Sequence, residues 1–496
     1  MSEYSLTDAF TMQGVWWLPG KPTERIAGTL RYSPESILLE LLGSFTLLGE
    51  GLLVHDTTSY ETVCGVTNDG ISLVLVKTLR AGFRWSFGAA GPVQTDRLMS
   101  SLLIIGLGND SDPLVSAMSC RTPGLAMWLG ESPMEFKEEN REGLTLRFRQ
   151  LPTDIIPIPT IDAHIEFETY ATVERERFSF SAETQACWHL RANTPQPLSW
   201  YLNQIEPVTA LLSLCAGVSM MPDQITIQSE DGGRRAYVVL RGLGKEYCTL
   251  EHVHEFFLPR YIFSADFSRC VSRWLAIYER IKQPSKLAMS VLLSDKLWPH
   301  VEFLSLMQAL EGLHRALRKG TYMDPVVYAA IRDQLVQAIP RGISSDHRAS
   351  LKARLRYGNE ISLAKRLQKL TKFLSKRERE QIFGEARSVP RQWVETRNYY
   401  THWDETLAPD ILDGQRLIYA IARLRSFLRV LYLCLAGVPK AALECALNGT
   451  SSEAQFLIQI LGMEQRLHNP ADQTGILMSI THIPAAEDDP NDRANS

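Results

Sequence analysis

Hydrophobic and polar residues alternate in short segments through the first half of the chain, a pattern typical of half-buried β-strands. Residues 165–173 follow this period of two, with Ile, Phe, Thr, Ala and Val on one side and Glu166 and Glu168 on the other. Residues 225–228 and 236–240 are two further segments joined by a glycine-containing turn, which predicts a hairpin. We therefore expect the first half to consist mainly of strands.

Short strands at close spacing favour a β-sandwich or a barrel-like fold over βαβ units. Residues 144–149 add another alternating segment. Residues 207–220 interrupt the strands with a pattern that predicts a helix. We interpret residues 1–264 as one β-rich domain.

Near residue 264 the apolar period changes to three or four, which predicts α-helices. The pattern covers residues 264–281, 301–317 and 362–374. Residues 410–436 form the longest predicted helix, with leucines along one stripe, and Gly437 follows as a stop signal. We expect this helix to be the spine of the second half.

Residues 340–356 are polar and basic and contain glycine and serine, so we predict a loop there. The expected fold class is α+β multidomain, with a β-rich N-terminal domain followed by an all-α helical bundle. The predicted organisation is a β-rich sensor or regulatory domain (1–264), a helical connector (265–298), an α-helical domain (299–445), a C-terminal helical extension (446–484) and a disordered tail (485–496).

Composition agrees with an ordinary globular protein. At 496 residues the chain exceeds what one hydrophobic core usually organises, so two or three domains are expected. The eight cysteines include no C-x-x-C pair, so neither a disulfide framework nor a zinc knuckle is indicated. The longest apolar run, residues 430–438, is too short to cross a membrane, and the first residues lack the pattern of a signal peptide. We expect a cytoplasmic protein with no membrane partner.

Charge is distributed unevenly along the chain. Residues 341–400 contain fifteen Lys/Arg and six Asp/Glu, a net charge of +9 in a protein whose total is −4. Such a segment indicates an anionic partner, most often nucleic acid. Helical spacings within it could follow an RNA backbone, or the same residues could form a solvated helix face. The candidate RNA-binding cations are Lys365, Arg366, Lys369, Lys372 and Lys376.

The most informative motif is Arg-Asn-Tyr-Tyr-Thr-His at residues 397–402, at the end of this basic segment. An imidazole such as that of His402 can take or give a proton near neutral pH, which suits RNA cleavage by attack of the ribose 2′-hydroxyl. Arg397 would bind the scissile phosphate and stabilise the extra negative charge of the transition state. Asn398 would orient the phosphate or the imidazole. This chemistry needs no metal and no cofactor, and it leaves a 2′,3′-cyclic phosphate.

The hexapeptide is predicted to lie in a helix that starts near Pro390 and ends before Pro409. Arg397 and His402 are five residues apart, so they diverge by roughly 140° around a regular helix. One copy therefore does not direct both side chains to one phosphate. Either the helix is distorted, or two copies form a composite site across the axis of a homodimer, and the second option is the more economical.

The spacing also has simpler interpretations. An Arg followed by a His after four to six residues is expected about once or twice by chance in a chain of this size, and Arg341 and His347 give a second match, in the predicted loop. On a plain helix surface Arg397 would pair with Asp404 or Glu405, with His402 satisfied by its surroundings. The spacing by itself favours this non-catalytic helix surface over a catalytic site.

A resemblance changes that balance. Residues 397–402, placed just before the long helix, resemble the R-N-x-x-x-H motif of the HEPN ribonuclease superfamily, and specifically of its Apea-like branch. Residues 303–311 are similar to the opening helix of that branch. Residues 14–19, Gly-Val-Trp-Trp-Leu-Pro, and the β-rich stretch that follows resemble the N-terminal domain found with it in bacterial anti-phage proteins.

The resemblance implies a dimeric, metal-independent endoribonuclease of abortive-infection type that cleaves RNA, with Arg397, Asn398 and His402 at the active site. Some HEPN toxins carry a modified Tyr two residues after the His, but here that position is Asp404, so control by such modification is not expected. Control by the N-terminal domain, which would sense a phage-derived trigger, is our preferred hypothesis. The alternative is a dimeric module that binds RNA or protein without cutting.

Other candidates are weaker. Tyr399 and Tyr400 could stack on unpaired bases or pack in a dimer interface. His252 and His254 would share one face of a strand and could ligate a metal, but no third ligand is marked by spacing. Glu311 and Arg315 are expected to form an i, i+4 ion pair. Four arginines of the long helix are expected to be exposed to solvent: Arg416, Arg423, Arg425 and Arg429.

Overall fold

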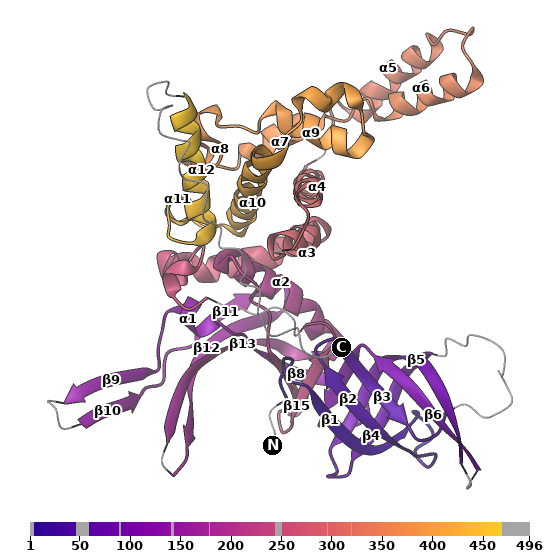
Figure 1. Ribbon diagram of the computed structural model, residues 1–496, viewed down its shortest axis with the longest axis vertical. Helices are drawn as coiled ribbons and strands as arrows, with labels where there is room; N and C mark the ends of the chain where they lie inside the picture. The colour runs from indigo at the N-terminus through magenta and orange to yellow at the C-terminus, as the bar shows by residue number, and fades with distance from the viewer. Residues whose placement is uncertain are drawn as a thin grey trace, which may run out of the picture.

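The computed structural model of the chain describes residues 4–45, 59–88, 91–139, 143–177, 179–243, 250–294, 296–318 and 320–468. Over these residues a β-rich N-terminal region is followed by an all-helical C-terminal region (Figure 1). The predicted fold class is therefore confirmed. The predicted disordered tail, residues 485–496, lies outside the described residues.

The N-terminal strands form one large antiparallel sheet. Thirteen of the described strands join it in the order β11-β12-β13-β8-β14-β15-β7-β5-β4-β1-β2-β3-β6, and β9 and β10 form a separate two-stranded ribbon. The strands are β1 (Phe10–Trp17), β2 (Ile26–Ser33), β3 (Ser36–Leu41), β4 (Ser59–Thr67), β5 (Ser72–Gly88), β6 (Gly91–Ser100), β7 (Leu102–Ile105), β8 (Leu114–Arg121), β9 (Met134–Glu139), β10 (Gly143–Phe148), β11 (Asp154–Ile158), β12 (Ala163–Arg175), β13 (Phe180–Pro197), β14 (Gln224–Ser229) and β15 (Arg235–Leu240).

Part of this sheet closes into a barrel. Strand β6 pairs with both β3 and β5, so the six strands β5-β4-β1-β2-β3-β6 form a ring. Trp16 fills its interior and is fully buried. Gly65 makes room for it, because a side chain at Gly65 would collide with the Trp16 ring. The barrel-like expectation is thus confirmed for the first hundred residues, while the remaining strands open into a wide sheet.

The helices are α1 (Leu125–Leu129), α2 (Leu198–Ala216), α3 (Phe267–Leu292), α4 (Pro299–Leu317), α5 (Pro325–Gln337), α6 (Ser345–Tyr357), α7 (Leu363–Thr371), α8 (Lys376–Phe383), α9 (Arg391–His402), α10 (Gly414–Ala436), α11 (Lys440–Leu447) and α12 (Ser452–His468). All four long helices predicted from periodicity are confirmed. Short 3-10 turns join several of the elements. Helix α2 starts earlier than predicted, at Leu198, because Pro207 is accommodated inside it rather than at its start.

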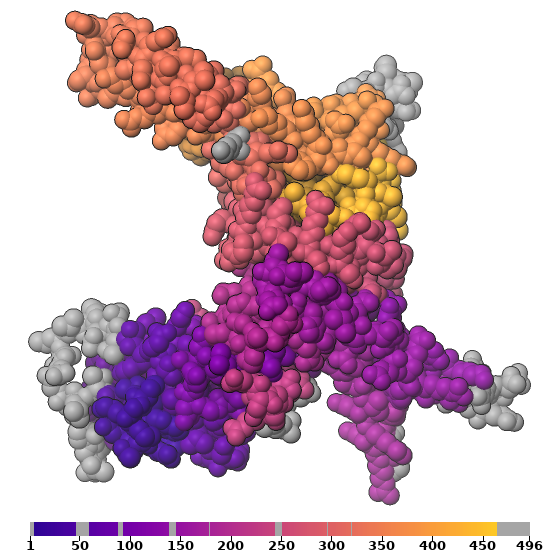
Figure 2. All heavy atoms as spheres, turned by 180° about the vertical axis from the view of Figure 1, so that it is seen from behind, coloured from indigo at the N-terminus to yellow at the C-terminus, as the bar shows by residue number. Residues whose placement is uncertain are grey.

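The predicted loop at residues 340–356 is wrong, because most of it is helix α6. Ser344 begins the helix by accepting a hydrogen bond from the His347 amide at 3.2 Å. Helix α6 packs mainly against α5, and together they form an arm that projects away from the rest of the protein (Figures 1 and 2). Most of the surface of α6 is therefore free to be polar. The Tyr328 hydroxyl ties the arm together by donating to the Leu355 carbonyl at 2.6 Å.

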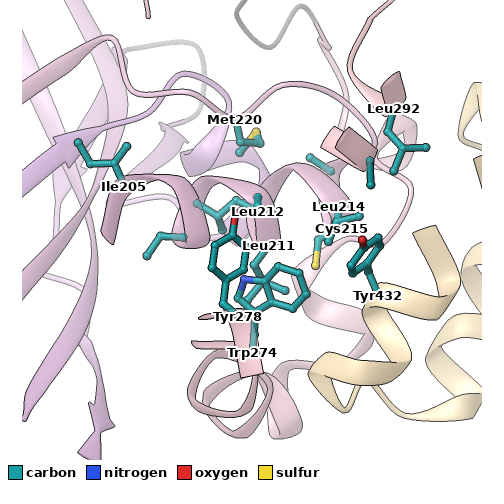
Figure 3. Packing of buried hydrophobic residues seen from close by; sticks show 14 of the residues in the cluster. Ile205, Leu211, Leu212, Leu214, Cys215, Met220, Trp274, Tyr278, Leu292 and Tyr432 are labelled. Carbon is teal, nitrogen blue, oxygen red and sulfur yellow. The ribbon is translucent and has the colours of Figure 1, made fainter. Parts of the chain in front are cut away.

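The N-terminal region and the helical region share a packed junction built from α2, α3 and α10. Trp274, Tyr278 and Tyr432 are buried there beside Cys215 (Figure 3). The Trp274 indole donates to the Pro207 carbonyl at 2.7 Å. The two regions are therefore joined by a common hydrophobic core rather than by a linker.

The prediction that the arginines of α10 are exposed is wrong for three of the four. Arg416 is exposed, but Arg423 is buried. Arg425 donates to the carbonyls of Val291 and Leu292 at 3.2 and 2.6 Å, at the end of α3. Arg429 is fully buried and donates to two carbonyls at the end of α2, those of Ser213 and Leu214, at 3.2 Å each. Carbonyls in the last turn of a helix have spare acceptor capacity, and these guanidinium groups donate to it from a neighbouring helix.

Candidate active site on helix α9

Helix α9 carries the hexapeptide and is held in place by its buried face. Pro390 precedes it, as predicted, and Trp393 and Thr396 are buried. The Thr396 hydroxyl accepts a hydrogen bond from the Leu412 amide at 2.9 Å, which fixes α9 to the chain just before α10. The helix is regular through His402, so the predicted divergence between Arg397 and His402 applies.

Arg397 points toward α4. Its guanidinium lies 3.4 Å from the Glu311 carboxylate, and it donates to the Asn398 side-chain oxygen at 3.2 Å. The alternative pairing with Asp404 or Glu405 is not formed. Asp404 instead accepts hydrogen bonds from the hydroxyl and amide of Thr406, which hold the pKa of its carboxyl below the usual range.

His402 is the last residue of α9 and is exposed. No side chain in the described part of the chain hydrogen-bonds or ion-pairs with its imidazole. Trp403 follows it in the left-handed conformation, with φ of 52°, and ends the helix. A single chain thus holds Arg397 against α4 and leaves His402 facing solvent, and it does not bring the two together.

Aromatic rings gather beside His402. The Tyr399 ring lies 5.5 Å from that of Tyr400 and 5.8 Å from that of Trp403, and Tyr400 also approaches the His300 ring at 6.1 Å. Burial raises the pKa of Tyr400 above its usual value. Trp403 is 70% exposed, so the cluster offers an open aromatic surface next to the imidazole.

Charged side chains extend from Glu311 across α4 to α7. Glu311 forms the predicted pair with Arg315 at 3.0 Å, and Arg315 also contacts Glu360 at 2.8 Å. Glu360 in turn contacts Arg366 at 3.1 Å, and Arg366 lies 3.3 Å from Nδ1 of His314. Glu360 is the member that the sequence analysis did not consider, because it is distant in sequence from α9 and belongs to no motif.

The predicted RNA-binding cations separate in the structure. Arg366 is buried in the network just described and cannot lie on a solvated RNA-binding face, which corrects that prediction. Lys365 is exposed and sits over the Tyr322 ring at 4.5 Å, and Lys376 is exposed at the start of α8. Lys369 and Lys372 are brought together, since both line one pocket at the end of α7.

The alternative metal site at His252 and His254 is not assembled. The segment is a short 3-10 turn rather than the expected strand, and the two rings stack at 5.3 Å. The Glu255 carboxylate accepts hydrogen bonds from the amides of Glu251 and His252. Among the described residues, no three His, Cys, Asp or Glu side chains gather closely enough to hold a metal ion. The described helices also include none that is both long and apolar enough to cross a membrane.

Comparison with known proteins identifies both halves of the chain. Residues 11–274 match the family model of ApeA N-terminal domain 1, and residues 304–442 match that of the Apea-like HEPN domain. No curated protein and no solved structure matches the chain. The second match contains α9 with its hexapeptide and the Glu311 that contacts Arg397. The chain therefore belongs to the family defined by ApeA N-terminal domain 1 and carries an Apea-like HEPN domain behind it.

Proposed function

We propose that the helical domain is a metal-independent endoribonuclease of HEPN type that acts as a homodimer. The observation that carries the proposal is the placement of the hexapeptide within the Apea-like HEPN match, with His402 exposed at the end of α9 and without a side-chain partner among the described residues. A solvent-facing imidazole beside open aromatic rings can meet an RNA strand directly. Arg397, half-buried against Glu311, supplies a fixed positive charge on the adjoining face.

In the proposed reaction the ribose 2′-oxygen attacks the adjacent phosphorus while the bond to the 5′-oxygen breaks. The His402 of one chain takes the 2′-hydroxyl proton, and a water molecule gives a proton to the leaving 5′-oxygen. Arg397 binds the phosphate oxygens and stabilises the charge of the pentacoordinate transition state. The products are a 2′,3′-cyclic phosphate and a 5′-hydroxyl.

Two copies are needed because Arg397 and His402 diverge within one chain. A two-fold axis next to the exposed end of α9 would place the His402 of each copy near the Arg397 of the other. Tyr399, Tyr400 and Trp403 would then stack on the bases that flank the cut. Lys365, Lys369, Lys372 and Lys376 would follow the RNA backbone away from the site.

We further propose that this nuclease acts in anti-phage defence by abortive infection, with the N-terminal region controlling it in response to a phage-derived trigger. The shared core at α2, α3 and α10 supports this control, because a change in the N-terminal region can reach the spine helix through packed side chains. Arg429 is one direct contact of this kind, since it joins α10 to the end of α2.

The test compares the wild-type protein with His402→Ala on labelled total RNA and tRNA in EDTA, and examines the product ends for a cyclic phosphate. His347→Ala is the matched control, because His347 is an exposed histidine of the same domain outside the hexapeptide. Cleavage by wild type and His347→Ala but not by His402→Ala supports the proposal. Equal cleavage by all three removes His402 from the mechanism.

If none of the purified proteins cleaves RNA, the same comparison is repeated in lysate from phage-infected cells, where a trigger is present. A pure binding module would bind RNA with equal affinity in all three forms and yield no cyclic phosphate under either condition. That result would show that the helical domain binds RNA without cleaving it.

A further inference from the structure

A pocket of about 330 Å³ lies between the C-terminal ends of α4 and α7. The described residues that line it are His314, Arg318, Lys369, Lys372 and Phe373. Three of these side chains carry a positive charge and none carries a negative one. The pocket lies at the far end of the charged network from Arg397, beyond Arg366, and is therefore separate from the hexapeptide.

His314, one of the residues that line this pocket, carries a buried hydrogen-bond donor. The side chain is 1% exposed, and its Nδ1 faces a guanidinium nitrogen of Arg366 at 3.3 Å. An arginine can only donate, so Nδ1 must accept, and the proton of the neutral imidazole is then on Nε2. Within the described part of the chain, that Nε2 has no hydrogen-bond partner. A buried N–H donor without a partner is rare in folded proteins and calls for an acceptor.

The cations around the pocket have no carboxylate partner that the described residues supply. Among the described residues, no carboxylate forms an ion pair with Arg318, Lys369 or Lys372. The nearby carboxylates are occupied, since Glu360 is shared between Arg315 and Arg366.

Helix ends do not account for these charges either. The last carbonyls of α4, those of Ala316 and Leu317, accept hydrogen bonds from Arg280 at 2.9 and 2.6 Å. The Phe373 carbonyl after α7 accepts from Lys440. Other cations thus already satisfy carbonyls at both helix ends, and Arg318, Lys369 and Lys372 remain available for an anion in the pocket.

We propose that this pocket binds a phosphate group, with Arg318, Lys369 and Lys372 contacting its oxygens and the Nε2–H of His314 donating to one of them. A phosphate offers the several acceptor oxygens that this set of donors requires, and charge-assisted hydrogen bonds to it are strong. Phe373 forms the apolar wall on which the organic part of a phosphate ester can rest. The phosphate can belong to a free nucleotide or to the backbone of an RNA strand.

Isothermal titration calorimetry on the full chain tests the proposal, with inorganic phosphate and adenosine 5′-monophosphate as probes. We expect one phosphate per chain. Lys372→Ala and Arg318→Ala should each weaken binding about tenfold, the effect of losing one hydrogen bond to a charged group. Lys352→Ala is the matched control, because Lys352 is exposed on the α6 arm. This variant should bind phosphate with the same affinity as the wild type. Lys372 is exposed, so its replacement leaves the fold intact.

Absence of phosphate binding at about 10 mM, far above what three cations and a buried donor require, overturns the proposal. Equal weakening by Lys352→Ala also overturns it, because binding would then reflect only general surface charge. None of these measurements uses RNA cleavage. They therefore test the phosphate site independently of the nuclease function.

A second arm identifies the source of the phosphate, using short single-stranded RNA and fluorescence anisotropy in the His402→Ala background. Competition between RNA and inorganic phosphate, with RNA affinity lost in Lys372→Ala, assigns the pocket to the RNA backbone. Adenosine monophosphate binding that is lost in Lys372→Ala, while RNA affinity is unchanged, assigns it to a free nucleotide. Both results support a phosphate site.

Discussion

The Arg397 guanidinium lies 3.4 Å from the Glu311 carboxylate, across the contact between α9 and α4. Both side chains are largely shielded from solvent, with 23% and 13% of their surfaces exposed. The pair therefore fixes the direction of the one arginine in the hexapeptide. It also connects the candidate active site to the charged network that ends at His314.

Replacing Glu311 with Gln should lower the rate of RNA cleavage by roughly ten- to hundredfold, because small misplacements of a catalytic group have effects of this size. RNA affinity should stay within about twofold, since the positive charge of Arg397 remains. Single-turnover rates and anisotropy measure the two quantities. Glu395→Gln is the control, because Glu395 pairs with the exposed Arg391 on the same helix. A cleavage rate equal to wild type would show that Glu311 does not position Arg397.

A composite dimer site predicts complementation between inactive variants. Arg397→Ala and His402→Ala should each be inactive alone, but co-expression should restore partial cleavage, because a mixed dimer contains one intact Arg397 and one intact His402 on opposite chains. The double variant Arg397→Ala/His402→Ala, co-expressed with wild type, serves as the control for dilution by inactive chains. Failure of the two single variants to complement would place the whole site within one chain.

The pair of the buried Arg366 with the partly exposed Glu360 predicts a strong effect of a small change at Gly320. A methyl group there would collide with the Arg366 guanidinium, which is held by Glu360 and His314. Gly320→Ala should lower the free energy of unfolding by about 2 to 3 kcal/mol, the upper part of the usual range for point mutations, because the displaced guanidinium is buried. Chemical denaturation measures this change.

Gly342→Ala is the control for that experiment, because a side chain at Gly342 meets open space. The double variant Gly320→Ala/Arg366→Met should lose less free energy of unfolding than the sum of the two single losses, since both changes act through the same guanidinium. Additive effects would show that the collision is relieved elsewhere.

His314 predicts a pH dependence of stability. Burial and the charges of Arg366, Lys369, Arg315 and Arg318 lower the pKa of His314 to about 4, whereas an unfolded histidine titrates near pH 6.5. The unfolded chain therefore binds this proton more readily than the folded one. The stabilising contribution is complete above pH 6.5 and is lost as the pH falls from 6.5 to 4.

Between pH 4 and 6.5, the wild type should bind more protons on unfolding than His314→Gln does, and the difference should approach about one proton. Denaturation at a series of pH values gives this number from the slope of the free energy of unfolding. Identical slopes for the two proteins would mean that His314 is not held neutral by the fold.

The sequence by itself determined the type of most elements and the position of the hexapeptide. Residues 165–173 alternate with a period of two and form part of β12, and the leucine stripe over residues 410–436 marks α10. Pro390 marks the start of α9, which places Arg397 and His402 on diverging faces. These features depend on neighbours a few residues away, so they can be read locally.

Only the tertiary structure decided which charged side chains face inward. Arg366 and Arg429 look like solvated cations in the sequence, yet both are buried. The carbonyl acceptors of Arg429 lie 215 and 216 residues away, at the end of α2. A buried guanidinium is stable only where such acceptors and carboxylates contact it. These partners come from distant parts of the sequence, so no local pattern predicts them. The same reason explains why Glu311 could be recognised as a helical partner of Arg315 but not as the partner of Arg397.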